Sequence, residues 1–163
     1  MKATRLSVDQ YMMSIAWAIR ARGNCRGRTV GAVIVKDRRI ISTGYNGTPY
    51  GMANCDEDGG CMRCRDREKY PSGTSYDLCI CVHAEQNAIL AAARFGIATE
   101  GAVIYTTLKP CFSCLKEALQ AKIVGIYYDE EWQELDKEKK QQYNYLADQF
   151  TEGIEWQPTK GVM

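Results

Sequence analysis

The sequence predicts an α/β fold: a three-layer α/β/α domain with a central mixed sheet of about five strands. First, apolar residues at helical spacing and β-rich runs follow one another in the order α-β-β-α-β-α-β-α, and the chain could end in a short strand at 153–156. Second, strands alternate with helices in the second half, which favours right-handed crossovers, parallel pairing and helices on both faces of the sheet. We expect one domain over residues 1–163, with a Cys-rich insertion at about 50–81.

The first half of the chain predicts a helix and a hairpin. Ser7 and Gln10 match a capping box, and the apolar residues that follow recur at helical spacing until Gly23. The segments GAVIVKD and RRIISTGYNG are β-rich and are joined by a charged turn at 37–39. This pattern predicts two antiparallel strands.

The second half predicts alternating helices and strands. AEQNAILAAARFG reads as a helix ended by Gly96, AVIYTTL as a strand, FSCLKEALQAK as a helix and IVGIYYD as a strand. The polar-faced segment 130–150 predicts a longer last helix. Between the two halves, residues 50–82 lack periodicity and hold five of the eight cysteines. A loop this long inside a domain is usually functional or held by something other than apolar packing.

Composition excludes several classes of protein. The formal net charge of +1 argues against a partner as acidic as a polynucleotide, because phosphate neutralisation needs a basic excess. No apolar run approaches the roughly 20 residues of a membrane span, and the N-terminus lacks the apolar core of a signal peptide. We therefore expect a cytoplasmic protein whose cysteines are thiols and metal ligands rather than disulfides.

Two short motifs carry the chemistry. His83, the only histidine, stands in His-Ala-Glu at a helix start, and Cys111 and Cys114 stand in Pro-Cys-Phe-Ser-Cys at the start of the next helix. One imidazole and two thiolates leave a fourth tetrahedral position for water, as in a catalytic zinc site. Zinc lowers the pKa of such water to about 7, and Glu85 is placed to move a proton without ligating. The pattern predicts a zinc-bound hydroxide and a Glu85 proton shuttle that together remove an amine from a ring.

The order H-x-E and then P-C-x-x-C resembles the signature of zinc deaminases. With Val30-Gly31-Ala32 and Gly44-Tyr45-Asn46-Gly47, residues 5–132 resemble the dCMP deaminase family. The resemblance implies a cytidine-deaminase-like fold and zinc-dependent hydrolysis of dCMP to dUMP and ammonia. The stretch 47–82 is longer than a compact tRNA-adenosine or free-cytosine deaminase needs, which also favours the nucleotide enzyme.

The resemblance also implies roles for single residues. Asn46 would bind the sugar hydroxyl, although Asn-Gly turn chemistry is an alternative, and the backbone N–H of Ala84 would hold the pyrimidine carbonyl. Glu85 would protonate the ring nitrogen. A 5′-phosphate would lie near Arg26 and Arg28, which offer forked donors. Trp132 would face the pyrimidine unless it packs in the core, and the remaining candidates for the active-site or effector region are Arg94, Tyr45 and Gly47.

The Cys-rich insertion predicts a second metal. Family resemblance implies a structural zinc here, and a closed site of four thiolates would supply folding energy to a loop with few apolar residues. The favoured ligands are Cys25, Cys55, Cys61 and Cys79. The rival set is Cys61, Cys64, Cys79 and Cys81, with neater C-x-x-C and C-x-C spacing, and the sequence leaves both open.

Three other functions share parts of this pattern. A tRNA-adenosine deaminase shares the motif but would need a basic face for RNA, and a free cytidine or cytosine deaminase needs no phosphate site. A zinc-stabilised binding module would need a fourth protein ligand beside His83, and no second histidine can supply it. The resemblance further implies a homo-oligomer, often a hexamer, with dCTP as activator and dTTP as inhibitor near residues 44–51.

Overall fold

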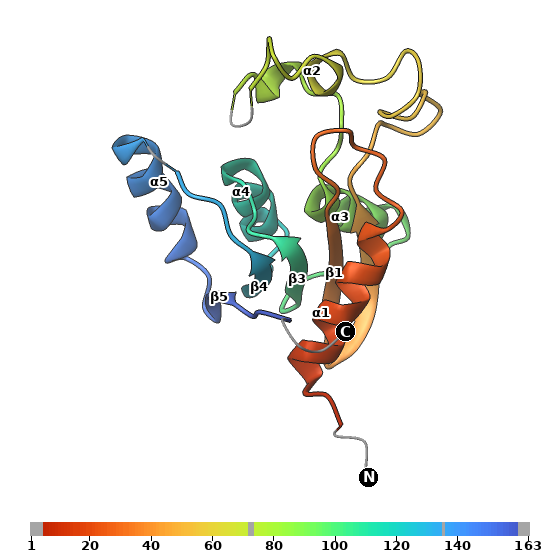
Figure 1. Ribbon diagram of the computed structural model, residues 1–163. Coiled ribbons are helices and arrows are strands. Elements are labelled where there is room, and N and C mark those ends of the chain that lie inside the picture. Colours follow the sequence, from red (N-terminus) through yellow and green to blue (C-terminus); the bar gives the residue numbers. More distant parts are fainter. Residues whose placement is uncertain (1–4, 72–73, 135, 160–163) are drawn as a thin grey trace.

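A mixed sheet of five strands forms the centre of the computed structural model, which describes residues 5–71, 74–134 and 136–159 (Figure 1). The strand order is β2-β1-β3-β4-β5. β1 pairs antiparallel with both β2 and β3, whereas β3, β4 and β5 are parallel. The expected mixed sheet, its parallel half and its short last strand are confirmed. The strands are β1 Gly31–Lys36, β2 Arg39–Tyr45, β3 Val103–Leu108, β4 Gly125–Glu130 and β5 Gly153–Trp156.

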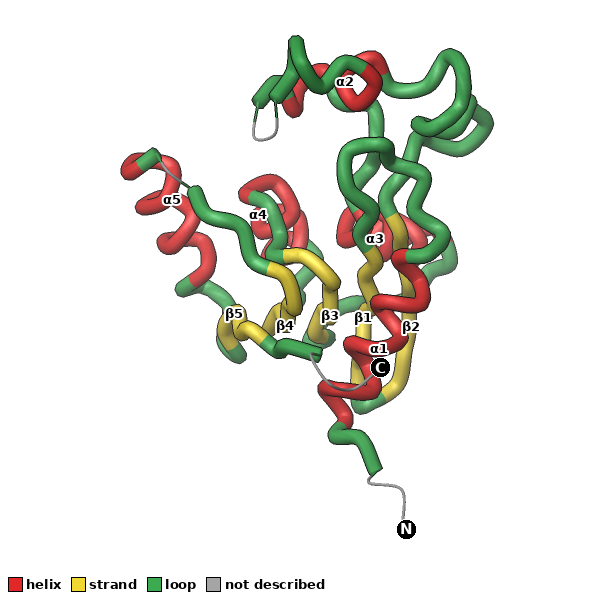
Figure 2. The backbone as a smooth tube through the Cα atoms, viewed as in Figure 1, coloured by secondary structure: helices red, strands yellow, loops and turns green. Residues whose placement is uncertain are grey.

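Helices cover both faces of the sheet (Figure 2). Alternate residues of β1 point to opposite faces: Val33 packs with Met13 of α1, while Ile34 packs in a second core that includes Leu115 of α4 and Tyr143 of α5. The three-layer prediction is therefore confirmed. Within the described ranges, each helix is too short or too polar to span a bilayer. The helices are α1 Val8–Arg20, α2 Met62–Arg65, α3 Ala84–Arg94, α4 Phe112–Gln120 and α5 Lys137–Ala147, with a 3-10 turn η1 at Tyr76–Leu78.

The first helix and the first hairpin follow the sequence prediction. Ser7 Oγ accepts the Gln10 backbone N–H at 3.1 Å, and Gln10 Oε1 accepts the Ser7 backbone N–H at 3.0 Å, so the capping box is present. The turn between β1 and β2 places Asp37 at φ 51° and Arg38 at φ 61°. Two left-handed residues in succession match the twist of a two-residue hairpin, and they set the pairing of the strands.

Glycine in β2 lets the helix α3 approach the sheet. A Cβ on Gly44 would lie 2.2 Å from the carbonyl oxygen of Ala84, in the first turn of α3. One turn further along, Ser42 Oγ donates to the carbonyl of Ala88 at 2.6 Å. These contacts seat the N-terminus of α3 at one end of the sheet. Figure 1 shows the loop that contains α2 beyond the same end.

The last helix is shorter than expected. The sequence predicted a helix over 130–150, but α5 spans Lys137–Ala147, and residue 135 lies outside the described ranges. Asp136 caps α5 by accepting the backbone N–H of Lys139 at 2.9 Å. The preceding segment turns back instead, because Trp132 donates to the Lys109 carbonyl at 2.8 Å and packs edge-on against Tyr143. A tertiary contact thus overrides the polar periodicity.

Candidate active site and metal centres

Two helix N-termini bring three candidate metal ligands together. His83 is the N-cap of α3 and Cys111 is the N-cap of α4, while Cys114 lies in the first turn of α4. Nδ1 of His83 is 3.4 Å from the Cys111 sulfur and 3.5 Å from the Cys114 sulfur, and the two sulfurs are 3.6 Å apart. Tetrahedral zinc with bonds of about 2.0 to 2.3 Å gives ligand separations of about 3.5 to 3.8 Å. The spacing therefore fits one zinc ion.

The chemistry of this group also fits zinc. Nitrogen and sulfur donors are the ligands that zinc prefers. The hydrogen bond between the Cys111 and Cys114 sulfurs lowers the pKa of Cys111. The hydrogen bond between His83 and Cys111 raises the pKa of His83 to about 9. Among the described residues, no fourth His, Cys, Asp or Glu ligand atom completes the group. It is an open, three-ligand arrangement, which is typical of catalytic zinc rather than of a closed structural site.

Glu85 is buried beside this group. It is 4% exposed, and Oε2 lies 3.5 Å from the Cys114 sulfur. Burial raises the pKa of Glu85, and a hydrogen bond from Thr106 partly opposes this effect. The Thr106 hydroxyl donates to Oε1 at 3.0 Å. Sequence reasoning missed Thr106, although a hydroxyl in a strand that reads as fully buried is a usable signal.

Backbone and side-chain bonds around His83 hold its helix in place. The His83 backbone N–H donates to Oε1 of Gln86 at 2.8 Å, and the Gln86 amide donates to Glu117 of α4 at 2.8 Å. The first peptide N–H of α3 belongs to Ala84, and helix geometry leaves it without a partner inside the helix. The two helices that carry the ligands are thus tied to each other.

The loop before β1 is held partly by Asn46, at the end of β2. Its Oδ1 accepts the Val30 backbone N–H at 2.8 Å, and its Nδ2 donates to the Arg28 carbonyl at 2.6 Å. These contacts give Asn46 a bracing role in the loop. One amide hydrogen and one lone pair are left for other partners.

The two predicted phosphate-binding arginines have different surroundings. Arg26 donates from Nη2 to the Asp56 carbonyl at 3.0 Å, and its backbone N–H donates to the Cys55 sulfur at 3.4 Å. Arg28 is about half exposed, with Nε 3.9 Å from Glu130 Oε2. Arg26 therefore joins the Cys-rich insertion to the loop before β1, whereas Arg28 remains open to solvent on one side.

An arginine that sequence reasoning missed lies inside the insertion. Arg63 is 3% exposed, and its Nε donates to the Thr74 carbonyl at 2.9 Å. Its guanidinium lies 4.3 Å from the centre of the Tyr76 ring, and that ring is edge-on to His83 at 6.4 Å. Its Nη2 is buried without a hydrogen-bond partner among the described residues. The residues around it in sequence gave no pattern that could have singled it out.

The remaining sequence candidates contact other parts of the fold. Trp132 packs against Tyr143, so core packing accounts for its ring. Arg94 is exposed at the far end of α3, nine positions from Glu85 and about 14 Å along the helix axis. The structure does not bring Arg94 to the three-ligand group.

Gly47 and Tyr45 lie where β2 leads into the insertion. Gly47 exchanges backbone hydrogen bonds with Val82 at 3.2 and 2.8 Å, and a Cβ there would come within 2.5 Å of Asn24 Oδ1. The Tyr45 carbonyl accepts from Asn87 of α3 at 2.7 Å. Gly47 therefore joins the start of the insertion to its end, and Tyr45 joins the end of β2 to α3.

Six cysteines gather in the insertion and the loop before β1. The favoured ligand set, Cys25, Cys55, Cys61 and Cys79, requires correction, because these four sulfurs do not form one group within 4.8 Å. Cys64 and Cys81 group with Cys25 and Cys55, and they also group with Cys61 and Cys79. The structure instead shows two groups. They are Cys25, Cys55, Cys64 and Cys81, and the rival set Cys61, Cys64, Cys79 and Cys81.

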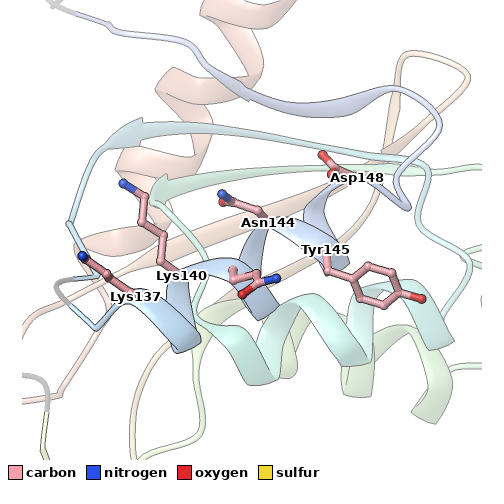
Figure 3. Close-up of a pocket in the computed structure, with 6 residues that line it drawn as sticks. Lys137, Lys140, Asn144, Tyr145 and Asp148 are labelled. Carbon is pink, nitrogen blue, oxygen red and sulfur yellow. The ribbon is translucent and has the colours of Figure 1, made fainter.

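A hollow on α5 has no relation to this chemistry (Figure 3). Its lining residues recur at helical spacing along one side of α5, and Lys137, Lys140 and Tyr145 are exposed. None of them is a candidate ligand or neighbours Glu85. The full lining is Lys137, Lys140, Gln141, Asn144, Tyr145 and Asp148.

Comparison with known proteins agrees with the geometry. Residues 6–130 match the family model described as the cytidine and deoxycytidylate deaminase zinc-binding region. A deoxycytidylate deaminase of Schizosaccharomyces pombe is 42% identical over 76% of this chain and 37% of the relative, and that of Saccharomyces cerevisiae is 40% identical over 82% and 41%. The chain thus spans about two fifths of the length of these curated relatives.

Two phage proteins match this chain over nearly their full length. The deoxycytidylate deaminase of Mycobacterium phage D29 is 38% identical over 76% of this chain and 94% of the relative. The crystal structure of dCMP deaminase from the cyanophage S-TIM5 in complex with dCMP and dUMP is 26% identical, with a TM-score of 0.71, and the match covers 95% of this chain and 100% of that one.

Proposed function

The chain belongs to the cytidine and deoxycytidylate deaminase zinc-binding family, and we propose that it hydrolyses dCMP to dUMP and ammonia. The observation that carries this proposal is the buried carboxylate of Glu85 beside an open group of one imidazole and two thiols. Relatives named deoxycytidylate deaminase, and a similar structure solved with dCMP and dUMP, support the choice of substrate.

His83, Cys111 and Cys114 would hold the catalytic zinc. When bound, zinc supplies a water nucleophile at neutral pH. We propose in addition that the Cys-rich insertion holds metal of its own, through sulfurs that the catalytic group does not use. This division assigns all eight cysteines to metal sites.

Glu85 would perform the proton transfers. Its raised pKa brings the carboxylate closer to the pKa range in which one group can both take up and release a proton near neutrality. It would take a proton from the attacking water and deliver it to the ring nitrogen. Thr106 fixes Oε1, so that Oε2 is left to face the reacting atoms. The unpaired N–H of Ala84 would hold the pyrimidine carbonyl.

The nucleotide would be selected by arginine. Of the two predicted arginines, Arg28 has the guanidinium that is more available to a phosphate, because it is about half exposed. Arg26 already donates to the Asp56 carbonyl. Arg63 is a further candidate, since its Nη2 is buried without a partner among the described residues and its ring neighbour Tyr76 approaches His83. A planar guanidinium offers two parallel donors to one phosphate.

We infer a homo-oligomer, with a hexamer as the expected form, in which dCTP activates and dTTP inhibits through the segment 44–51. Support comes from exposed aromatic rings there, because Tyr50 is fully exposed and Tyr45 is 39% exposed. Exposed aromatic side chains are favoured at interfaces between subunits.

Ammonia release from matched substrates tests the proposed function. Zinc-loaded protein would be assayed with dCMP, deoxycytidine, cytosine and an adenosine-containing RNA. We expect the highest kcat/KM for dCMP and a slow reaction with deoxycytidine. A preference for the nucleoside, the free base or the RNA would contradict the assignment.

A further inference from the structure

The six cysteines outside the catalytic group form two overlapping sets of four. Each set has all its sulfurs within 4.8 Å of one another, and both sets contain Cys64 and Cys81. We propose that the insertion holds two zinc ions in one six-thiolate cluster, in which the sulfurs of Cys64 and Cys81 bridge the two metals. Each metal would have two further ligands of its own. They are Cys25 and Cys55 for one metal, and Cys61 and Cys79 for the other.

The sulfur separations match metal–thiolate geometry. Cys64 lies 3.7 Å from Cys25 and 3.8 Å from Cys79, and Cys61 lies 3.9 Å from Cys79. Two sulfurs bound to one tetrahedral zinc at about 2.3 Å are about 3.8 Å apart. A disulfide would require about 2.05 Å, and all eight cysteines are free thiols.

The number of sulfurs favours two metals over one. Four of the six cysteines are buried, and the other two pack against them. One tetrahedral zinc uses four thiolates and would leave two sulfurs of the cluster without a metal. Two zinc ions need eight ligand positions, which six sulfurs fill only if two of them bridge. The bridging pair must belong to both sets, and Cys64 and Cys81 are the two residues that do.

One guanidinium and one backbone N–H lie beside the sulfurs, where they would offset part of the thiolate charge. Six thiolates and two zinc ions carry a net charge of −2. A Cβ on Gly27 would lie 3.1 Å from Arg67 Nη1 and 3.4 Å from the Cys25 sulfur. The Arg67 guanidinium and the Cys25 sulfur therefore both lie next to Gly27. The backbone N–H of Arg26 donates to the Cys55 sulfur at 3.4 Å. Such donors stabilise thiolate ligands.

The insertion has little else to order it. In the described part of the insertion, regular structure amounts to the four-residue helix α2 and the short turn η1, and the side chains of Tyr50, Met52 and Met62 are exposed. The cluster would join three chain segments, because its cysteines come from residue 25, residues 55–64 and residues 79–81. The last segment ends two residues before His83, so the cluster would also fix the approach to α3.

Metal counting tests the two-metal cluster without using activity. Native mass spectrometry and elemental analysis of zinc-saturated, desalted protein should give three zinc ions per chain. The variant His83→Ala, which loses a catalytic ligand, should keep two. A total of two in the unmodified protein, with one retained in the variant, would overturn the second metal of the cluster. Loss of dCMP turnover with three zinc ions bound would count against the proposed function alone.

Cadmium NMR tests the shared sulfurs. The His83→Ala variant would be loaded with ¹¹³Cd in place of zinc. We expect two resonances in the tetrathiolate region, split by ¹¹³Cd–¹¹³Cd coupling through the bridging thiolates. Two uncoupled resonances, or a single tetrathiolate resonance at saturation, would overturn the bridging assignment of Cys64 and Cys81.

Discussion

The hydroxyl of Thr106 donates a hydrogen bond of 3.0 Å to Oε1 of Glu85, which joins the central strand β3 to the first turn of α3. Both residues are buried. Rotation of the carboxylate away from Thr106 would remove the hydrogen bond of the buried Oε1 of Glu85, and an unpaired buried acceptor costs about 1 to 3 kcal/mol. The sheet thus sets the direction of the proton shuttle.

Thr106→Val should lower kcat for dCMP by roughly 10- to 100-fold, the equivalent of losing a hydrogen bond to a charged group. The substitution keeps the side-chain volume, so zinc content should not change. Thr106→Ser should restore most of kcat. The matched control is Thr107→Val, since Thr107 is equally buried but accepts from the Gly31 backbone and lies away from Glu85. Steady-state kinetics with equal loss of kcat in both valine variants would contradict this role.

Gly44→Ala should displace α3 and impair the site. The new Cβ would lie 2.2 Å from the Ala84 carbonyl oxygen, and overpacking of this kind costs about 1 to 3 kcal/mol. Gly96→Ala is the control at the other end of α3, where φ is 68° and a Cβ meets nothing within 4 Å. It should cost about 1 to 2 kcal/mol. Urea unfolding would measure the stability of both variants. Zinc analysis and an activity assay should show loss of the catalytic zinc and of turnover only in Gly44→Ala. An active, zinc-replete Gly44→Ala would show that the close approach of α3 to Gly44 is not needed.

Replacing the arginines proposed to bind the phosphate should lower kcat/KM for the nucleotide but not for the nucleoside. Arg28→Ala, alone or with Arg26→Ala, should lower kcat/KM for dCMP by about 10- to 100-fold and leave deoxycytidine almost unaffected. Arg63→Ala is tested in the same way, because its buried Nη2 has no partner among the described residues. The control Arg94→Ala removes an equal charge from the far end of α3. It should leave kcat/KM unchanged for both dCMP and deoxycytidine. If every arginine variant keeps its dCMP preference, the phosphate site lies elsewhere.

The sequence predicted those features that depend on neighbours along the chain. The strand and helix order, the Ser7 cap and the two helix starts that carry His83 and Cys111 all follow from local patterns. The start of α5 could not be predicted, because it depends on Trp132 turning back to pack on Tyr143. Local spacing likewise missed Thr106, whose partner is 21 positions away.

The cysteine grouping shows the same limit. Neat C-x-x-C and C-x-C spacing pointed to the set that the structure does contain, whereas the favoured set is divided between two groups. Which sulfurs meet depends on how the loop before β1 folds against the insertion, and that contact is made by Arg26 with Cys55 and Asp56. Sequence spacing carries no information about it.

Turnover of dCMP by zinc-loaded Glu85→Gln tests the proposed proton shuttle most directly. The amide has the shape of the carboxylate but can neither take a proton from water nor deliver it to the ring nitrogen. We predict that kcat falls by at least about 10²- to 10⁴-fold, the usual contribution of general acid–base catalysis. Zinc content and circular dichroism should match those of the unmodified protein. Near-normal kcat in a fully zinc-loaded, folded variant would contradict a proton-transfer role for Glu85.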